Sequence, residues 1–72
     1  MTYGEVLSYY IEKTGIKPAE LARRINVSRG QISDLVSGRT KDPSLSRAKA
    51  IADALGVTLQ EMADLMDMDK ED

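Results

Sequence analysis

Residues 18–37 read PAELARRINVSRGQISDLVS, a stretch with the pattern of two short helices joined by a tight turn. Pro18 suits the first turn of a helix, because its φ is fixed near a helical value and its missing N–H would be unpaired there anyway. Apolar residues recur at the spacing that places them on one stripe of each helix. They are Leu21, Ala22 and Ile25 in the first half, and Ile32, Leu35 and Val36 in the second.

The residues between the two helices specify a turn and a new helix start. Asn26 lies where the chain must reverse, and asparagine tolerates a positive φ better than most residues that carry a Cβ. Ser28 and Gln31 have the Ser-x-x-Gln spacing of a capping box, in which each side chain bonds the backbone N–H of the other residue. Gly38 suits the C-cap position. The sequence thus predicts a second helix over residues 28–37.

This pattern resembles the helix-turn-helix of the phage repressor and Cro family, the lambda-repressor-like domains of XRE-type transcriptional regulators. The resemblance covers roughly residues 3–66. It is carried by Leu21-Ala22, Asn26-Val27-Ser28, Ile32, Leu35 and Ser37-Gly38, and then by Pro43-Ser44-Leu45 and residues 51–59. Two positions depart from the family pattern: Pro18 stands where a glutamine often holds a phosphate, and Asn26 stands at the usual turn glycine.

The resemblance implies an all-α fold, a compact lambda-repressor-like bundle of five helices that contains the helix-turn-helix. It also implies a transcriptional regulator, of the repressor type, that binds double-stranded DNA sequence-specifically with helix 28–37 in the major groove. Family members commonly bind two half-sites as dimers and often pair through their last helices. We therefore expect a homodimer on a pseudo-palindromic operator, with half-sites about 10 base pairs apart. An antitoxin or restriction-controller role has the same signature.

Apolar spacing outside the motif predicts three more helices. The first covers about residues 3–14 and ends at Gly15, the next runs from near Ser44 to Gly56, and the last opens at a Thr-x-x-Glu capping box that begins with Thr58. Their inward-facing positions are Val6, Leu7, Tyr10 and Ile11; Leu45, Ala48, Ile51, Ala52 and Leu55; and Leu59, Met62, Leu65 and Met66. No strand pattern occurs, so five helices and no sheet are expected.

Length and composition agree with one small domain. We divide the 72 residues into a DNA-binding domain over residues 1–67 and an acidic tail over residues 68–72 that is expected to fray. The chain has no cysteine or histidine, so the usual zinc ligands are missing, and a nucleophile and general base would have to come from carboxylates, serine and lysine alone. We therefore expect no enzyme, cofactor, metal or small-molecule substrate. With no signal peptide and no apolar run of about 20 residues, a cytoplasmic, nucleoid-associated protein without a membrane partner is expected.

The charges are distributed unevenly along the chain. The net charge of −2 on its own argues against a nucleic-acid partner. However, residues 17–49 contain eight basic and three acidic side chains, a net charge of +5, whereas the rest of the chain contains two basic and nine acidic ones, a net charge of −7. The positive charge is thus concentrated on and around the helix-turn-helix, which favours a nucleic-acid partner for that part.

Projection of helix 28–37 at 100° per residue identifies the side chains that face away from the core. Long hydrogen-bond donors occur only at Arg29 and Gln31, on the flanks of the first turn. Arg29 suits a bidentate contact to guanine O6 and N7, or else a phosphate contact. Gln31 either grips adenine N6 and N7, contacts a phosphate, or is held by the capping box. The other positions of the base-reading face are Gly30, Ser33 and Asp34.

Two residues of this face are unusual for a DNA reader. Asp34 is a carboxylate that would lie beside phosphates. It accepts a hydrogen bond from cytosine N4, orients Arg29 or Arg39 through an ion pair, or is a surface carboxylate kept just off the DNA, and we favour the orienting role. Gly30 costs helix stability but lets the backbone approach base edges or a thymine methyl group, although tolerance at a first helical turn explains it equally well.

Phosphate contacts are expected from both sides of helix 28–37. The loop after Gly38 carries two cations and a hydroxyl, and in the family this loop runs along the DNA backbone. Ser28 is mainly expected to serve its cap, and either Arg23 or Arg24 suits a contact from the first motif helix. The full set of phosphate candidates is Lys17, Arg23, Ser28, Ser37, Arg39, Thr40 and Lys41.

A protein-interaction module is the main alternative function. Methionine is adaptable and favoured at interfaces, and several methionines lie near the C-terminus. Three of the apolar residues there, Met62, Leu65 and Met66, also have core spacing, which favours packing over partner binding. Both functions are compatible, because a DNA-binding domain can also dimerise.

Overall fold

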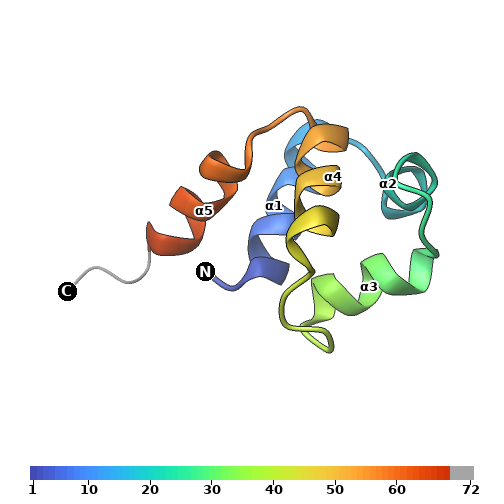
Figure 1. Ribbon diagram of the computed structural model, residues 1–72, viewed down its shortest axis with the longest axis horizontal. Helices are drawn as coiled ribbons and strands as arrows, with labels where there is room; N and C mark the ends of the chain where they lie inside the picture. Colours follow the sequence, from blue (N-terminus) through green and yellow to red (C-terminus); the bar gives the residue numbers. More distant parts are fainter. Residues whose placement is uncertain (69–72) are drawn as a thin grey trace.

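Five helices form the structure, a computed structural model that describes residues 1–68. They are α1 (Tyr3–Thr14), α2 (Pro18–Arg24), α3 (Arg29–Ser37), α4 (Leu45–Leu55) and α5 (Leu59–Asp67), as Figure 1 shows. Residues 1–68 contain no strand, and none of their helices is long and apolar enough to cross a membrane. The predicted all-α fold of five helices is confirmed.

Capping residues set most of the helix ends, largely as predicted. Ser28 and Thr58 each accept from the backbone N–H three residues later, and both capping boxes are complete. Asn26 has a φ of 63°, which confirms the positive φ expected at the turn between α2 and α3. A further capping box, which we did not predict, joins Thr2 and Glu5 at the start of α1. The C-caps of α1, α3 and α4 are Gly15, Gly38 and Gly56.

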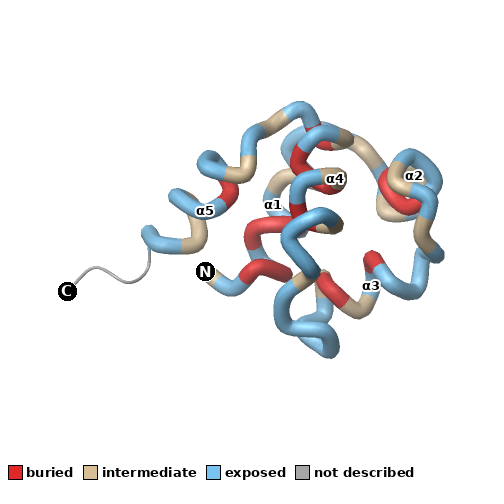
Figure 2. Tube along the Cα trace, in the orientation of Figure 1, coloured by how far each residue is buried: buried red, intermediate tan, exposed pale blue. Residues whose placement is uncertain are grey.

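One hydrophobic core lies between the helices, as the buried segments in Figure 2 show. Helix α1 packs against α3, α4 and α5, while α2 packs against α3 and α4. The core residues come from every helix: Tyr3, Val6, Leu7, Leu21, Ala22, Ile32, Leu35, Ile51, Ala52, Leu55 and Met62. Other predicted inward-facing residues are partly buried against this core, among them Tyr10, Ile11, Ile25, Val36, Leu59, Leu65 and Met66.

The prediction that Leu45 lies in the core is wrong. Its side chain is 77% exposed, although its spacing places it on the same stripe as the buried Ala48. Leu45 is the first residue of α4, and it lines a groove together with Leu59 and Met66 of α5. Helix α5 therefore lies near the first turn of α4 without covering the Leu45 side chain.

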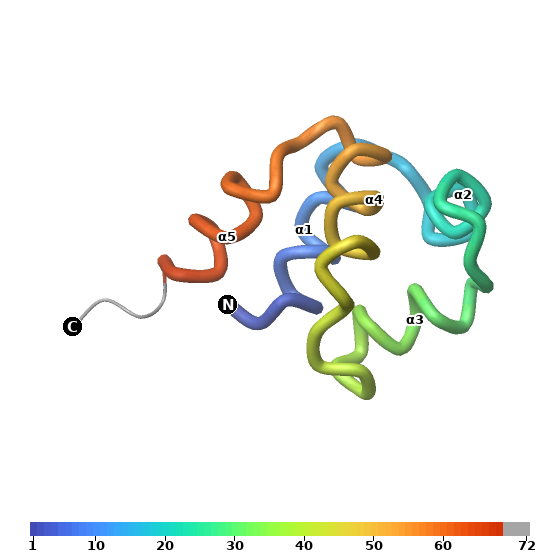
Figure 3. The backbone as a smooth tube through the Cα atoms, viewed as in Figure 1, coloured from blue at the N-terminus to red at the C-terminus, as the bar shows by residue number. Residues whose placement is uncertain are grey.

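The two ends of the molecule carry different helices. Helices α2 and α3 lie at one end of the long axis and α5 lies at the other, with α1 and α4 between them (Figure 1). The start of α1 reaches back toward α5, where the Met1 amino group donates to the Met66 carbonyl oxygen at 3.1 Å, and Figure 3 shows these segments close together. Of the predicted acidic tail, only the exposed Met68 is described, and residues 69–72 lie outside the described residues.

Candidate nucleic-acid interface

The outer face of α3 is open to solvent along its whole length. Ile32 and Leu35 are buried on the inner side, so the helix turns its opposite side outward. Five of the six residues assigned to that face and its flanks are exposed, and the sixth, Asp34, is partly exposed. They are Arg29, Gly30, Gln31, Ser33, Asp34 and Ser37. The structure therefore places all predicted base-reading residues on one accessible surface.

The capping box at the start of α3 uses hydrogen-bonding groups of two residues that were predicted to contact DNA, Ser28 and Gln31. Ser28 Oγ accepts from the Gln31 N–H at 3.2 Å, and Gln31 Oε1 accepts from the Ser28 N–H at 3.0 Å and from its hydroxyl at 3.3 Å. A bidentate contact to adenine needs both the oxygen and the nitrogen of the glutamine amide. Because the oxygen serves the cap, Gln31 can donate through Nε2 only, which excludes the bidentate contact to adenine while the cap is kept.

Arg29 is the one long donor of this face without a partner in residues 1–68. Its neighbour Gly30 adds no bulk, because a Cβ built there would meet nothing closer than Ser28 Oγ at 3.8 Å. The first turn of α3 therefore combines a free guanidinium with a flat backbone surface. Such a surface lets the helix axis lie close to the base edges while one arginine reaches into the groove.

The C-terminal end of α3 is tied to the loop that follows it. The Thr40 N–H donates to the Asp34 carbonyl oxygen at 3.0 Å, and Ser37 Oγ donates to the same oxygen and accepts from the Arg39 N–H, each at 3.3 Å. Asp34 Oδ1 lies 3.9 Å from Arg39 Nε, whereas no ion pair joins Asp34 to Arg29 within the described chain. Of the two partners considered for Asp34, the structure thus favours Arg39.

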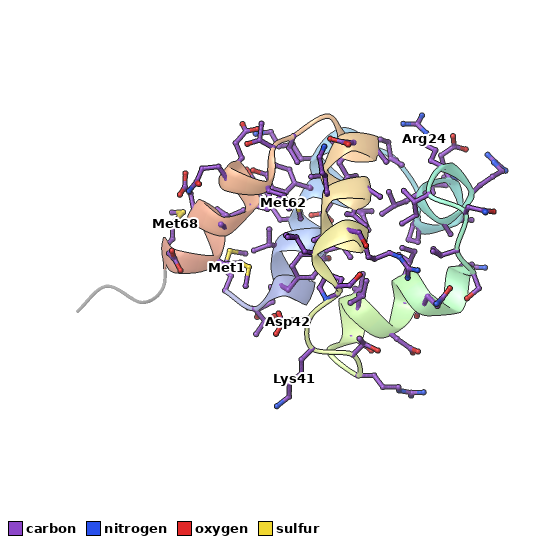
Figure 4. All side chains as sticks on the ribbon, in the orientation of Figure 1. Met1, Arg24, Lys41, Asp42, Met62 and Met68 are labelled. Atoms are coloured by element: carbon purple, nitrogen blue, oxygen red, sulfur yellow. The ribbon has the colours of Figure 1, made fainter. Side chains whose placement is uncertain are left out.

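The loop between α3 and α4 presents one cation outward and turns one carboxylate toward α1. Figure 4 shows the Lys41 side chain pointing away from the body of the protein. Asp42 lies near Tyr3, and burial of Tyr3 together with the charge of Asp42 raises the pKa of the phenol to about 12. The loop also closes a pocket of about 230 Å³ against α3, and Arg47 of α4 lines it beside Gln31. Arg47 is a cation near the reading face that the sequence argument did not single out.

Two of the three cations assigned to the α2 side are already paired. Glu20 bonds both Arg23 and Arg24, and the hydrogen bond from Arg24 and the charge of Arg23 hold the pKa of Glu20 below its ordinary value of 4.5. Arg24 also donates to the Ala54 carbonyl oxygen at 3.1 Å. Lys17 is exposed at the N-cap of α2 and has no cap hydrogen bond from its side chain. Arg23 remains 75% exposed despite its ion pair, so it still has access to solvent.

A contact with α1 also fixes the C-terminal end of α3. A Cβ added to Gly4 would lie 2.4 Å from the Leu35 carbonyl oxygen and 2.8 Å from that of Val36. Only glycine permits the first turn of α1 to approach the last turn of α3 this closely. Gly4 was not predictable from the sequence, because a glycine near a helix start carries no local signal of a long-range backbone contact.

The acidic residues of α5 lie far from this surface. Glu61, Asp64 and Asp67 belong to α5, at the end of the long axis opposite α2 and α3 (Figure 1). The cations around α3 therefore have no acidic side chain of α5 beside them. The uneven charge along the sequence becomes an uneven charge along the molecule.

Comparison with known proteins agrees with this geometry. A family model described as helix-turn-helix matches residues 7–62, which is more than half of the 72-residue chain. A search of curated proteins found no match. The matched residues contain all of α2, α3 and α4, with parts of α1 and α5. The chain therefore belongs to the helix-turn-helix family of Cro/C1-type regulators, and it is a DNA-binding regulator of this type.

Proposed function

We propose that this protein is a sequence-specific repressor that inserts α3 into the major groove of an operator. The observation that carries this proposal is the exposed outer face of α3, a helix capped at both ends and held against α1 at Gly4. A rigid, exposed helix with cations at its flanks is the arrangement by which this motif reads base edges. A DNA-bound regulator of this kind is expected in the cytoplasm, associated with the nucleoid.

Base reading is assigned to the first half of α3. Arg29 is proposed to donate to guanine O6 and N7, because it is the free long donor on this face in residues 1–68. Gln31 keeps its cap and donates through Nε2, while Gly30 and Ser33 allow close approach to the bases. Asp34 is proposed to orient Arg39 rather than to contact a base, in keeping with their 3.9 Å ion pair.

Phosphate binding is assigned to residues on both sides of α3. Arg39, Thr40 and Lys41 are all exposed on the loop after α3, and Lys17 and Arg23 are exposed on the side of α2. The hydroxyls of Ser28 and Ser37 each donate one hydrogen bond and accept another within α3 and the loop that follows it. We give Ser28 the structural role, because its bonds with Gln31 close the capping box at the start of α3. We retain Ser37 as a phosphate contact, for which its hydroxyl exchanges the Asp34 carbonyl oxygen for a phosphate oxygen.

A homodimer on a pseudo-palindromic operator completes the proposal. The groove between α4 and α5 supports it, since this groove has a volume of about 310 Å³ and is lined mainly by apolar residues. Its rim carries Leu45, which is 77% exposed. A two-fold axis through this region would place Leu45 of each copy against the groove of the other and would leave both α3 helices free for DNA.

Selection of bound duplexes from a random pool, repeated at two salt concentrations, tests the proposal. A palindromic consensus whose half-sites lie about 10 base pairs apart would support a dimeric reader. Enrichment of a consensus that is not palindromic would support sequence-specific binding and contradict the dimer. A pool that stays random, with binding that does not depend on salt, would contradict DNA binding as proposed and favour a protein-interaction module.

A further inference from the structure

Arg24 joins the helix-turn-helix to α4. Its Nη1 donates to the Ala54 carbonyl oxygen at 3.1 Å, and its Nε donates to Glu20 Oε2, also at 3.1 Å. One guanidinium thus bonds a carboxylate on its own helix and a backbone carbonyl 30 residues further along the chain. Figure 4 labels Arg24 on α2, on the side of the molecule where α4 ends.

The C-terminal end of α4 lacks a cation of its own. The last carbonyls of a helix have no partner within the helix and carry its negative dipole end. The Gly56 N–H donates to the carbonyls of Ala52 and Asp53, whereas the Ala54 carbonyl receives the Arg24 guanidinium. The last turn of α4 contains no basic residue. Arg24 therefore supplies from α2 the donor and the positive charge that α4 does not provide.

We propose that Arg24 is a positioning residue, which holds α2, and with it α3, in the orientation that fits the major groove. This inference rests on the proposed DNA-binding function. It reassigns Arg24, which the sequence left as an alternative to Arg23 for a phosphate contact. Arg23 bonds only Glu20 within the described chain and is 75% exposed, whereas Arg24 is 47% exposed and bonds two elements.

Two long-range contacts of the reading unit have complementary roles beside the packing of its core residues. The contact of Gly4 with the last turn of α3 fixes one end of the unit, and Arg24 fixes the side of α2 against α4. Loss of the Arg24 bond lets α2 and the start of α3 pivot about the Gly4 contact. Only part of the population then has the orientation that reads bases, and the apparent affinity falls by that fraction. Binding to random DNA depends on charge and is less sensitive to orientation.

Three variants separate positioning from phosphate binding. Arg24→Ala, Arg24→Lys and the matched control Arg23→Ala are titrated with the selected operator and with a random duplex at several salt concentrations, at a temperature where circular dichroism shows each variant folded. We expect Arg24→Ala to bind the operator about fivefold more weakly, the factor that corresponds to a net hydrogen bond of about 1 kcal/mol. Its affinity for random DNA and its salt slope should not change.

The conservative variant gives a second readout. Arg24→Lys keeps the charge, but one ammonium cannot reproduce the two-sided bridge to Glu20 and Ala54. It should therefore lose operator affinity as well, although less than Arg24→Ala does. Arg23→Ala should weaken both duplexes alike and lower the salt slope by about 0.9.

Several results would overturn the inference. If Arg24→Ala weakens both duplexes, flattens the salt slope and is fully rescued by lysine, Arg24 contacts a phosphate. If it binds both duplexes as the wild type does, the Ala54 contact positions nothing. If the wild type itself selects no duplex, the proposed function fails, and positioning is then tested without DNA by hydrogen exchange. In that case, α2 amides of Arg24→Ala that remain as protected as those of Arg23→Ala contradict the inference.

Discussion

Replacing Gly4 with alanine tests the contact that fixes α3 against α1. The new Cβ would lie 2.4 Å from the Leu35 carbonyl oxygen, so the backbone of α3 must move by about 0.6 Å to reach even the 3.0 Å limit of real Cβ contacts. Overpacking costs about 1–3 kcal/mol, and the better helix propensity of alanine returns about 1 kcal/mol. Because both clashing atoms are backbone, we take the upper end and expect a net loss of about 2 kcal/mol in the free energy of unfolding. For a domain of this size that corresponds to a fall in Tm of about 8–16 °C.

Urea denaturation followed by circular dichroism measures this loss, and Gly30→Ala is the matched control. At Gly30 the added Cβ meets only Ser28 Oγ, at 3.8 Å, so the same substitution should stabilise the protein by about 0.4–1 kcal/mol. Gly4→Ala should also weaken operator binding, since it displaces the end of α3. The reasoning would be refuted if Gly4→Ala were as stable as the wild type or gained as much as Gly30→Ala.

Four further predictions address the reading face, the loop, the core and the groove. Arg29→Ala should cost about 1–3 kcal/mol on the selected operator and relax preference at one base pair, whereas an equal loss on random DNA would rule out base reading. Lys41→Ala should weaken all duplexes alike and lower the salt slope by about 0.9 in titrations; an unchanged slope would exclude its phosphate contact. Since burial and a nearby carboxylate raise the pKa of Tyr3 to about 12, its contribution to folding is complete below pH 10 and is lost as the pH rises toward 12. The loss in the free energy of unfolding, up to about 3 kcal/mol in urea titrations, should disappear in Tyr3→Phe but persist in the control Tyr9→Phe. Leu45→Glu should reduce the dimer fraction in sedimentation while changing monomer stability by no more than about 0.5 kcal/mol, and an unchanged dimer would exclude the groove.

The helices and their ends were predictable because their signals are local. A capping box, a turn asparagine and the spacing of apolar residues act within a few positions of the chain, and the structure confirms them at Asn26 and Ser28. The exposure of Leu45 was not predictable in this way. Its helical spacing is that of a core residue, but whether it is covered depends on where α5 crosses α4. That crossing is a tertiary feature with no marker near Leu45.

The candidate interface, too, was predictable only in part. The outer face of α3 follows from helical projection, so its residues were all identified from the sequence. The hydrogen bonds that each of these side chains makes were not predictable, because several side chains compete for the same partners. The sequence allows three roles for Gln31, and the structure shows its side-chain oxygen in the cap. It also allows either Arg23 or Arg24 as a phosphate contact, and only Arg24 bonds Ala54. Gly4 carried no signal, since its contact lies with a helix about thirty residues away.

Backbone NMR during titration with the selected operator duplex tests the central claim most directly. If α3 enters the major groove, the largest amide shifts should fall within Arg29–Ser37 and the loop residues 39–41, and the amides of α5 beyond its dimer contacts should change little. Shifts that concentrate on α5 while those of α3 remain in place would contradict the account.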